Sequence, residues 1–282
     1  MRELEFVKAH GLGNDFIIVD CLHDELGDTD LPALSIRLCD RHFGIGADGL
    51  VRILPSQTAD YRMQIMNSDG SEAEMCGNAI RCFANYLVGR GMAGDRMTIE
   101  TPSGAKDVQV IRTGGQLGFR VNVGAPSLDP EHIPVLGYNG PVISLPLEVG
   151  GRMFDVTCVS VGNPHCVIFL DSVDDIPLEH LGRAIETHPA FPKRTNVEFA
   201  QVLGRDKVRV RVWERGAGLT LACGTGACAT VVAGNLNGVL DRTAAVHLPG
   251  GELDIEWAED GDLYMTGPAQ EVFTGTIKAG NG

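Results

Sequence analysis

Two cysteines, each followed by a glycine and a helix-like run, indicate how this chain is built. NSDGSEAEMCGNAIRC (residues 67–82) contains Cys76, and ERGAGLTLACGTGACA (residues 214–229) contains Cys223, 147 positions later. The runs that follow, NAIRCFANYLVGRG and TGACATVVAGNLNG, both end at glycine, a residue typical of helix C-termini. The same strand-to-helix arrangement is therefore predicted at two places in the chain.

The similarity between these places extends beyond the cysteines. At the same offset, YRMQIM (61–66) aligns with VRVRVW (208–213) and TPSG (101–104) aligns with LPGG (248–251). GNDFIIVD (13–20) resembles GNPHCVIFLD (162–171) at an offset of 149. The further identical pairs at the 147 offset are Arg62/Arg209, Gly91/Gly238, Pro102/Pro249, Gly104/Gly251 and Asp107/Asp254. Chance similarity is the alternative, but an internal duplication is favoured.

Each half is predicted to consist of strands, one central helix and further strands. YRMQIMN (61–67) and KVRVRVWE (207–214) alternate polar and apolar residues, the period of a β-strand. MTIETPSGAKDVQVI (97–111) and AAVHLPGGELDIEW (244–257) indicate hairpins that turn at Pro-Ser-Gly and Pro-Gly-Gly.

We predict an α+β fold of two similar domains, each a strand barrel or curled sheet around a central helix, with the active site in the interdomain cleft. The N-terminal domain is expected to span residues 1–122, with 267–282 returning to it, and the C-terminal domain residues 123–266.

Composition limits the functions to be considered. The chain has 282 residues and a formal charge of −14, which argues against a nucleic-acid partner. Neither a signal peptide nor an apolar run long enough for a bilayer is found in the sequence, so we expect a cytoplasmic protein with reduced cysteines. No cysteine spacing typical of zinc occurs, so no metal site is predicted. GIGADG (44–49) lacks dinucleotide-binding spacing and is interpreted as a turn. Simple burial is expected for Cys21, Cys39, Cys82, Cys158, Cys166 and Cys228.

A cysteine at a helix start has a chemical use. Unpaired N–H groups and partial positive charge in the first turn favour an anion, so the pKa of a thiol there is expected to fall. An adjacent glycine lets the N–H groups approach a ligand carboxylate closely. Two such thiols facing each other suit racemisation or epimerisation at a carbon next to a carboxylate. One thiolate would remove the α-proton while the opposed thiol delivers another, and backbone N–H groups would stabilise the charge that develops.

The two cysteine segments, together with GLGNDF (11–16), GNPH (162–165) and TNVEF (195–199), closely resemble the signatures of the diaminopimelate epimerase family. The likeness runs from residue 7 to residue 275, nearly the whole chain. It implies two similar barrel-like domains and a cofactor-independent enzyme. The reaction implied interconverts LL- and meso-2,6-diaminopimelate, for lysine and peptidoglycan-precursor synthesis. The only partners implied are this small-molecule substrate and a second copy of the chain in a homodimer.

The resemblance also implies roles for individual residues. Cys76 and Cys223 would form the acid/base pair, and His165 and Glu214 would support them near the reacting amine. Arg215 would bind the distal carboxylate of the substrate. The family contains members with glutamine where this chain has Gly49, so a side-chain contact to substrate is in doubt there. The substrate-binding residues implied are Asn14, Asn67, Gly77, Asn78, Asn163, Asn196, Glu214, Arg215, Gly224 and Thr225.

Other interpretations remain open at this point. Asn14 and Asn163 follow glycines and fit ordinary turns, and His165 fits a satisfied strand histidine. Glu214 and Arg215 fit a solvated charged pair. Another two-thiol racemase of the proline-racemase type is the nearest rival function. A duplicated amino-acid-binding or redox-sensing protein is the rival that is not an enzyme.

Overall fold

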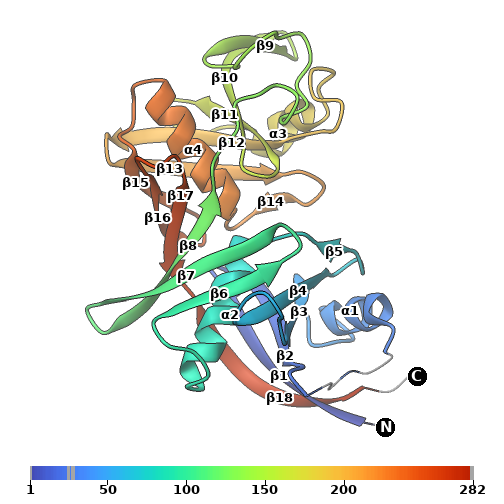
Figure 1. Ribbon diagram of the computed structural model, residues 1–282. Coiled ribbons are helices and arrows are strands. Elements are labelled where there is room, and N and C mark those ends of the chain that lie inside the picture. The colour runs from blue at the N-terminus through green and yellow to red at the C-terminus, as the bar shows by residue number, and fades with distance from the viewer. Residues whose placement is uncertain (1, 24–25, 27–28, 280–282) are drawn as a thin grey trace. The chain divides into compact units, whose positions relative to one another are not determined.

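The computed structural model describes residues 2–23, 26 and 29–279, and the chain divides into two compact units (Figure 1). Unit 1 comprises Met1–Val121 and Gly267–Gly282, and unit 2 comprises Asn122–Thr266. The division expected from sequence, at 122/123 and 266/267, differs by one residue at the first boundary and by none at the second. Residues 267–282 are grouped with the N-terminal segment because strand β18 pairs antiparallel with β1.

Unit 1 wraps its strands around one buried helix, α2 (Gly77–Gly89). This helix packs against β1, β2, β3, β4 and β18. Its Ile80, Phe83 and Leu87 are fully buried among strand residues such as Phe119. Burying a side chain of that size stabilises the fold by about 1.5–3 kcal/mol. A second helix, α1 (Leu31–Cys39), covers the outside of β3 and β4. The strands are β1 (Arg2–Gly11), β2 (Asn14–Asp20), β3 (Gly49–Leu54), β4 (Tyr61–Asn67), β5 (Glu72–Ala73), β6 (Arg96–Thr101), β7 (Gly104–Thr113), β8 (Gln116–Gly124) and β18 (Gln270–Ala279).

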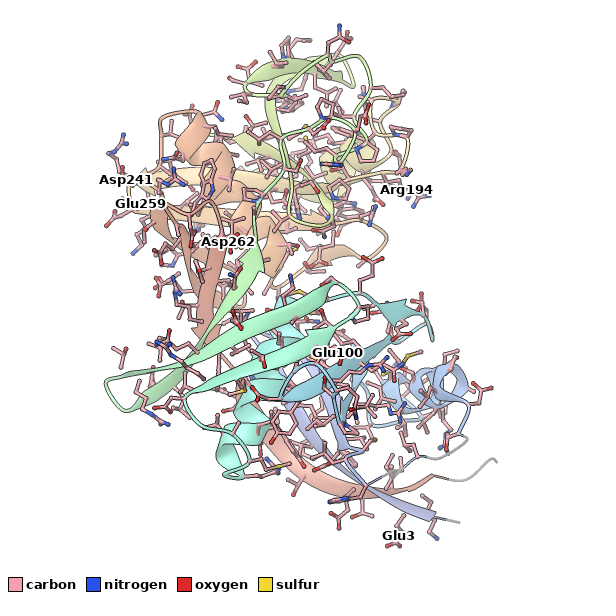
Figure 2. The ribbon with its side chains drawn as sticks, in the orientation of Figure 1. Glu3, Glu100, Arg194, Asp241, Glu259 and Asp262 are labelled. Carbon is pink, nitrogen blue, oxygen red and sulfur yellow. The ribbon has the colours of Figure 1, made fainter. Side chains whose placement is uncertain are left out.

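Unit 2 has the same plan around helix α4 (Gly224–Leu236), which packs against β10, β11, β12, β13, β15 and β16. Because α4 is surrounded by strands, its sequence is apolar or small on every face. Helix α3 (Leu178–Glu186) packs against β9, β12, β13 and β14. Asn122 at the start of the unit donates to Asp262 Oδ2 at 2.8 Å, and Asp262 is labelled in Figure 2. The strands are β9 (Leu145–Val149), β10 (Arg152–Ser160), β11 (Pro164–Phe169), β12 (Asn196–Gly204), β13 (Lys207–Glu214), β14 (Gly218–Thr220), β15 (Thr243–Leu248), β16 (Gly251–Trp257) and β17 (Leu263–Pro268).

The strand pairing is repeated between the units. In unit 1, β1 and β2 are antiparallel, β2 and β3 parallel, β3 and β4 antiparallel, and β4 and β6 parallel. In unit 2, β10 to β13 and β15 take these places with the same directions. The chain enters β2 and β11 through Gly13 and Gly162, whose φ angles of 86° and 82° favour glycine. The predicted duplicated α+β fold is therefore confirmed.

The strands, hairpins and central helices predicted from the sequence are present in the structure. The strands predicted at 61–67 and 207–214 are β4 and β13 to the residue, and both hairpins are present. Gly91 and Gly238, just past α2 and α4, have positive φ angles. The outer helices α1 and α3 were not predicted from the sequence. None of the helices in the described part of the chain is both long and apolar enough to cross a membrane.

Candidate active site

Cys76 is the N-cap residue of α2, in extended backbone with φ −142° and ψ 118°. Its carbonyl accepts the first helical hydrogen bond from the Ile80 N–H at 3.0 Å. The thiol is half-buried and donates to Asn14 Oδ1 at 3.6 Å. The predicted neighbours Gly77 and Asn78 form the first turn of the helix, so the structure brings Asn14 and this helix start together.

A directed chain of hydrogen bonds sets the orientation of the two asparagines beside Cys76. Arg81, buried on α2, donates to Asn78 Oδ1 at 2.7 Å. Asn78 Nδ2 donates to Asn14 Oδ1 at 3.0 Å, and Asn14 Nδ2 donates to Asp48 Oδ2 at 2.7 Å. A guanidinium can only donate and a carboxylate can only accept, so both amides have one consistent orientation. Asn14 therefore presents an oxygen to the thiol.

Asp48 belongs to an ionic cluster next to Asn14. It accepts from Arg41 at 2.8 Å and from the Asp15 N–H at 3.0 Å. Asp15 also binds Arg41 at 2.7 Å and Lys8 at 2.5 Å, and Lys8 donates to the Gly46 carbonyl. Burial acts to raise the pKa of Asp15, but the hydrogen bonds from Arg41 and Lys8 outweigh it and lower this pKa to about 2.

Cys223 is the corresponding N-cap residue of α4, with φ −121° and ψ 108°. Its sulfur accepts from the Gly226 N–H at 3.4 Å and lies 3.6 Å from Thr225 Oγ1. The side chain is buried, with 7% of its surface exposed. Gly224 and Thr225 begin the helix, as Gly77 and Asn78 do in unit 1.

The expected fall in pKa at Cys223 is wrong. Burial raises its pKa well above the usual thiol value, and the negative charges of Glu214 and Glu198 add to this effect. The hydrogen bonds from Thr225 and Gly226 act in the opposite direction but are outweighed. A buried helix start that also faces two carboxylates therefore keeps Cys223 as a thiol near neutral pH.

His165 lies on β11, fully buried within unit 2. Its Nδ1 is 2.7 Å from Glu198 Oε1 on the neighbouring parallel strand β12, and its Nε2 is 2.9 Å from Asn163 Oδ1. Glu198 is also fully buried. Three polar residues of unit 2 thus form one connected group, of which Asn163 and His165 were predicted and Glu198 was not.

The remaining predicted residues of unit 2 lie at strand ends. Asn196 Oδ1 accepts from the Arg215 N–H at 2.9 Å, and Asn196 Nδ2 donates to the Pro164 carbonyl at 2.8 Å. Glu214 Oε1 accepts from Thr220 Oγ1 at 2.6 Å. The Arg215 side chain is exposed, with its guanidinium 3.3 Å from the Lys193 carbonyl.

Asn67 is the last residue of β4, as Glu214 is the last residue of the corresponding strand β13. The Asn67 side chain donates to Ser71 Oγ at 2.9 Å. Asn67 is paired in register with Gly49. A Cβ at Gly49 would lie 2.9 Å from the Met66 carbonyl oxygen, so a larger residue there would require a shift of the backbone. GIGADG, predicted as a turn, is irregular backbone that leads into β3.

Three polar residues that hold the predicted ones, Arg81, Glu198 and Asp48, were not predicted from the sequence. Arg81 and Glu198 stand inside segments that were quoted as motifs, NAIRC and TNVEF, and Asp48 stands inside GIGADG. Charged residues within otherwise apolar runs were the available signal for Arg81 and Glu198. The six cysteines expected to be buried are buried, and burial raises the pKa of Cys82 to about 12.

Comparison with known proteins gives the family. The family model described as diaminopimelate epimerase matches residues 6–128 and 157–272. The chain belongs to the diaminopimelate epimerase family. It is 56% identical over 274 residues to a diaminopimelate epimerase of Pelotomaculum thermopropionicum, with 96% of this chain and 98% of the relative covered. It is 54% identical over 275 residues to one of Moorella thermoacetica, with the same coverage of both chains.

Solved structures with low sequence identity share the fold of this member of the diaminopimelate epimerase family. A PhzF-family phenazine biosynthesis protein of Bacillus anthracis matches with a TM-score of 0.74 at 17% identity, covering 99% of this chain and all of that one. A hydroxyproline epimerase of Agrobacterium vitis matches with a TM-score of 0.69 at 14% identity, covering 98% and 92%. At these identities the likeness shows a shared two-domain, pseudo-symmetric architecture.

Proposed function

We propose that this chain is a cofactor-independent epimerase that interconverts LL-2,6-diaminopimelate and meso-diaminopimelate. Membership of the diaminopimelate epimerase family supports the substrate. The observation that carries the chemistry is that each half of the duplicated chain places one cysteine at the N-cap of its central helix, Cys76 on α2 and Cys223 on α4. Two equivalent acid/base groups are what inversion at one carbon requires.

In the proposed reaction the two helix starts face a common substrate. A thiolate on one side takes the α-proton, so the C–H bond breaks and an S–H bond forms. The thiol on the other side gives its proton to the opposite face of the carbon, so the number of protons is unchanged. Because burial raises the pKa of Cys223, we assign it as the thiol that donates the proton. Cys76, whose S–H donates to Asn14 Oδ1, must lose that proton before it can act as the base. Each turnover exchanges the protonation states of Cys76 and Cys223.

Backbone N–H groups would bind the reacting carboxylate. The first turns of α2 and α4 present N–H groups from Gly77, Asn78, Gly224 and Thr225, where the helix dipole favours negative charge. Charge that develops on the carboxylate during proton removal would be stabilised there. Electrostatic stabilisation of this kind usually contributes more to catalysis than any other single effect.

The substrate carries an amino-acid group at each end, so the site needs donors and acceptors away from the thiols as well. We assign Asn67, Asn196 and Arg215 to the distal end, where arginine suits paired hydrogen bonds to a carboxylate. Asn14, Asn163, His165 and Glu214 would surround the reacting amino group and the thiols. An ordinary amino acid lacks the distal groups and would leave these polar side chains without hydrogen-bond partners. The site would therefore discriminate against it.

The test is turnover by purified reduced protein, measured with separate stereoisomers. We expect epimerisation of LL- and meso-diaminopimelate and none of proline. Cys76→Ala and Cys223→Ala should each abolish turnover while keeping the wild-type melting temperature. Turnover of proline alone would favour a proline-racemase activity instead. Binding of diaminopimelate without any exchange of its α-proton would favour a binding or sensing role.

We also propose that the protein is a cytoplasmic homodimer. Its free cysteines support the cytoplasm, and the resemblance to the family is the basis for the dimer. Sedimentation velocity on reduced protein should give the mass of two copies. A single 30.1 kDa species across micromolar concentrations would refute the dimer without affecting the proposed reaction.

A further inference from the structure

His165 and Glu198 form an ion-pair geometry in the interior of unit 2. The Nδ1 to Oε1 distance is 2.7 Å, and both side chains have 0% of their surface exposed. On its other side the ring meets Asn163 Oδ1 at 2.9 Å. Both ring nitrogens therefore face oxygen acceptors. Only a doubly protonated imidazole ring donates to two acceptors at once.

The corresponding strands of unit 1 form without such a charged pair. Parallel strands β11 and β12 pair His165 with Asn196, and parallel strands β2 and β3 pair Phe16 with Gly49 in the same way. Glu198 lies two residues after Asn196, so its equivalent in unit 1 is Val51, two residues after Gly49.

Phe16 and Val51 are buried and apolar, with 3% and 0% of their surface exposed. Unit 1 thus builds the same pair of strands with an ordinary hydrophobic contact. Burying two charged groups costs free energy that a hydrophobic pair of similar size does not cost. The charged pair in unit 2 is therefore better explained by function than by stability.

Glu198 also lies directly under the start of α4. A Cβ added at Gly226 would lie 2.6 Å from Glu198 Oε1 and 3.3 Å from Cys223 Sγ, so the glycine permits this close approach. The second carboxylate oxygen, Oε2, is buried and has no hydrogen-bond partner in the described part of the chain. His165 is therefore the residue that principally holds the carboxylate, and the pair sits next to the proposed proton donor.

We propose that Glu198 is a positioning residue that holds the His165 ring, doubly protonated and in one orientation, beside the first turn of α4. The proposal rests on the proposed function, in which His165 belongs to the active site. Glu198 fixes the Nδ1–H and Asn163 fixes the Nε2–H, so the ring cannot rotate.

The test compares the wild type with Glu198→Gln and Glu198→Asp, using protein labelled with ¹⁵N in its histidine rings. In the wild type at pH 7 we expect His165 to carry protons on both ring nitrogens. In Glu198→Gln it should lose one of them. A wild-type ring with a single proton overturns the proposal, including the case in which Asn163 presents its amide nitrogen to Nε2. The wild-type spectrum alone can overturn the proposal, so this readout does not require any variant to fold.

Kinetics provide the second readout. Loss of a charge-assisted hydrogen bond predicts a fall in kcat of about 10- to 100-fold for Glu198→Gln, with little change in KM and an altered pH profile. Glu198→Asp keeps the charge with a shorter reach, so its kcat should lie between the two. Glu100→Gln is the control, because Glu100 (Figure 2) is a carboxylate of unit 1 bound to Ser56 and Thr58. It should retain wild-type kinetics.

The outcomes separate this proposal from the proposed function. Normal epimerisation in Glu198→Gln, or a fall in melting temperature with an unchanged His165 spectrum, leaves Glu198 with a structural role only and overturns the proposal. A second outcome is that His165 is doubly protonated only when Glu198 is present, but the protein does not epimerise diaminopimelate. That result would refute the proposed function and retain the positioning role of Glu198.

Discussion

Replacing Gly226 with alanine adds one methyl group where α4 comes closest to Glu198. The new Cβ would lie 2.6 Å from Glu198 Oε1, whereas ordinary contacts begin at 3.4 Å, so the oxygen must retreat by 0.8 Å. The hydrogen bond from His165 Nδ1 to that oxygen is 2.7 Å long. A retreat of this size along the bond takes it past the limit of about 3.2 Å for a good hydrogen bond.

Two opposing contributions set the change in stability. Alanine is favoured over glycine inside a helix by about 1 kcal/mol. Overpacking a filled core costs about 1–3 kcal/mol, and a weakened buried hydrogen bond adds about 1 kcal/mol. We therefore expect Gly226→Ala to lower the free energy of unfolding by about 1–3 kcal/mol and kcat by about 10-fold or more.

The assay is a thermal melt together with turnover of both stereoisomers. Gly89→Ala is the matched control, because Gly89 also lies on a central helix and a Cβ there meets nothing within 4 Å. It should melt at or above the wild-type temperature with unchanged kcat. A Gly226→Ala protein as stable and as active as this control would refute the reasoning about the Glu198 contact.

Asp48→Asn should reduce kcat/KM by about 10-fold with little effect on melting, because a neutral amide at 48 weakens the charge-assisted hydrogen bond that holds Asn14 Nδ2 away from Cys76. Steady-state kinetics against the wild type decide it, and equal kcat/KM counts against a role for this hydrogen bond in positioning Asn14. The lowered pKa of Asp15 stabilises the fold above the unfolded value of 3.8, and this stability is lost as pH falls towards about 2. In urea unfolding, the wild type should therefore lose roughly 2 kcal/mol more stability across that window than Asp15→Asn does. Glu214→Gln removes one cause of the raised pKa at Cys223, so alkylation of that thiol by iodoacetamide at pH 8 should become faster. An unchanged rate would show that the charge of Glu214 does not contribute to the raised pKa.

How far the sequence predicts the fold depends on whether a feature is local. The strands at 61–67 and 207–214 were predicted to the residue because alternation is a property of the strand itself. The central helices were predicted because an apolar run is bounded by glycine at each end. The outer helices α1 and α3 were missed although each carries leucine or isoleucine in a helical spacing. Their apolar residues, Leu31, Leu34 and Leu38 in α1 and Leu178, Leu181 and Ile185 in α3, are separated by the same 147 positions as the two cysteines.

The candidate site was less predictable because its groups are set by contacts between distant segments. The sequence placed Cys223 at a helix start, which alone lowers a thiol pKa. Glu198 and Glu214 reach it only through the folding of β12 and β13, and together with burial they reverse the direction. Asp48 was taken for part of a turn because its role depends on Asn14, 34 residues away. Residue types could be predicted here, but partners could not.

The central claim is that two thiols act on opposite faces of one carbon, and the fate of the α-proton in D₂O tests it most directly. Each stereoisomer is incubated separately and stopped at early conversion, and deuterium at the α-carbon is measured in both substrate and product. The account predicts deuterium in the newly formed stereoisomer and almost none in the recovered substrate, in both directions. Equal labelling of substrate and product from the start would mean that a single base serves both faces, and would contradict it.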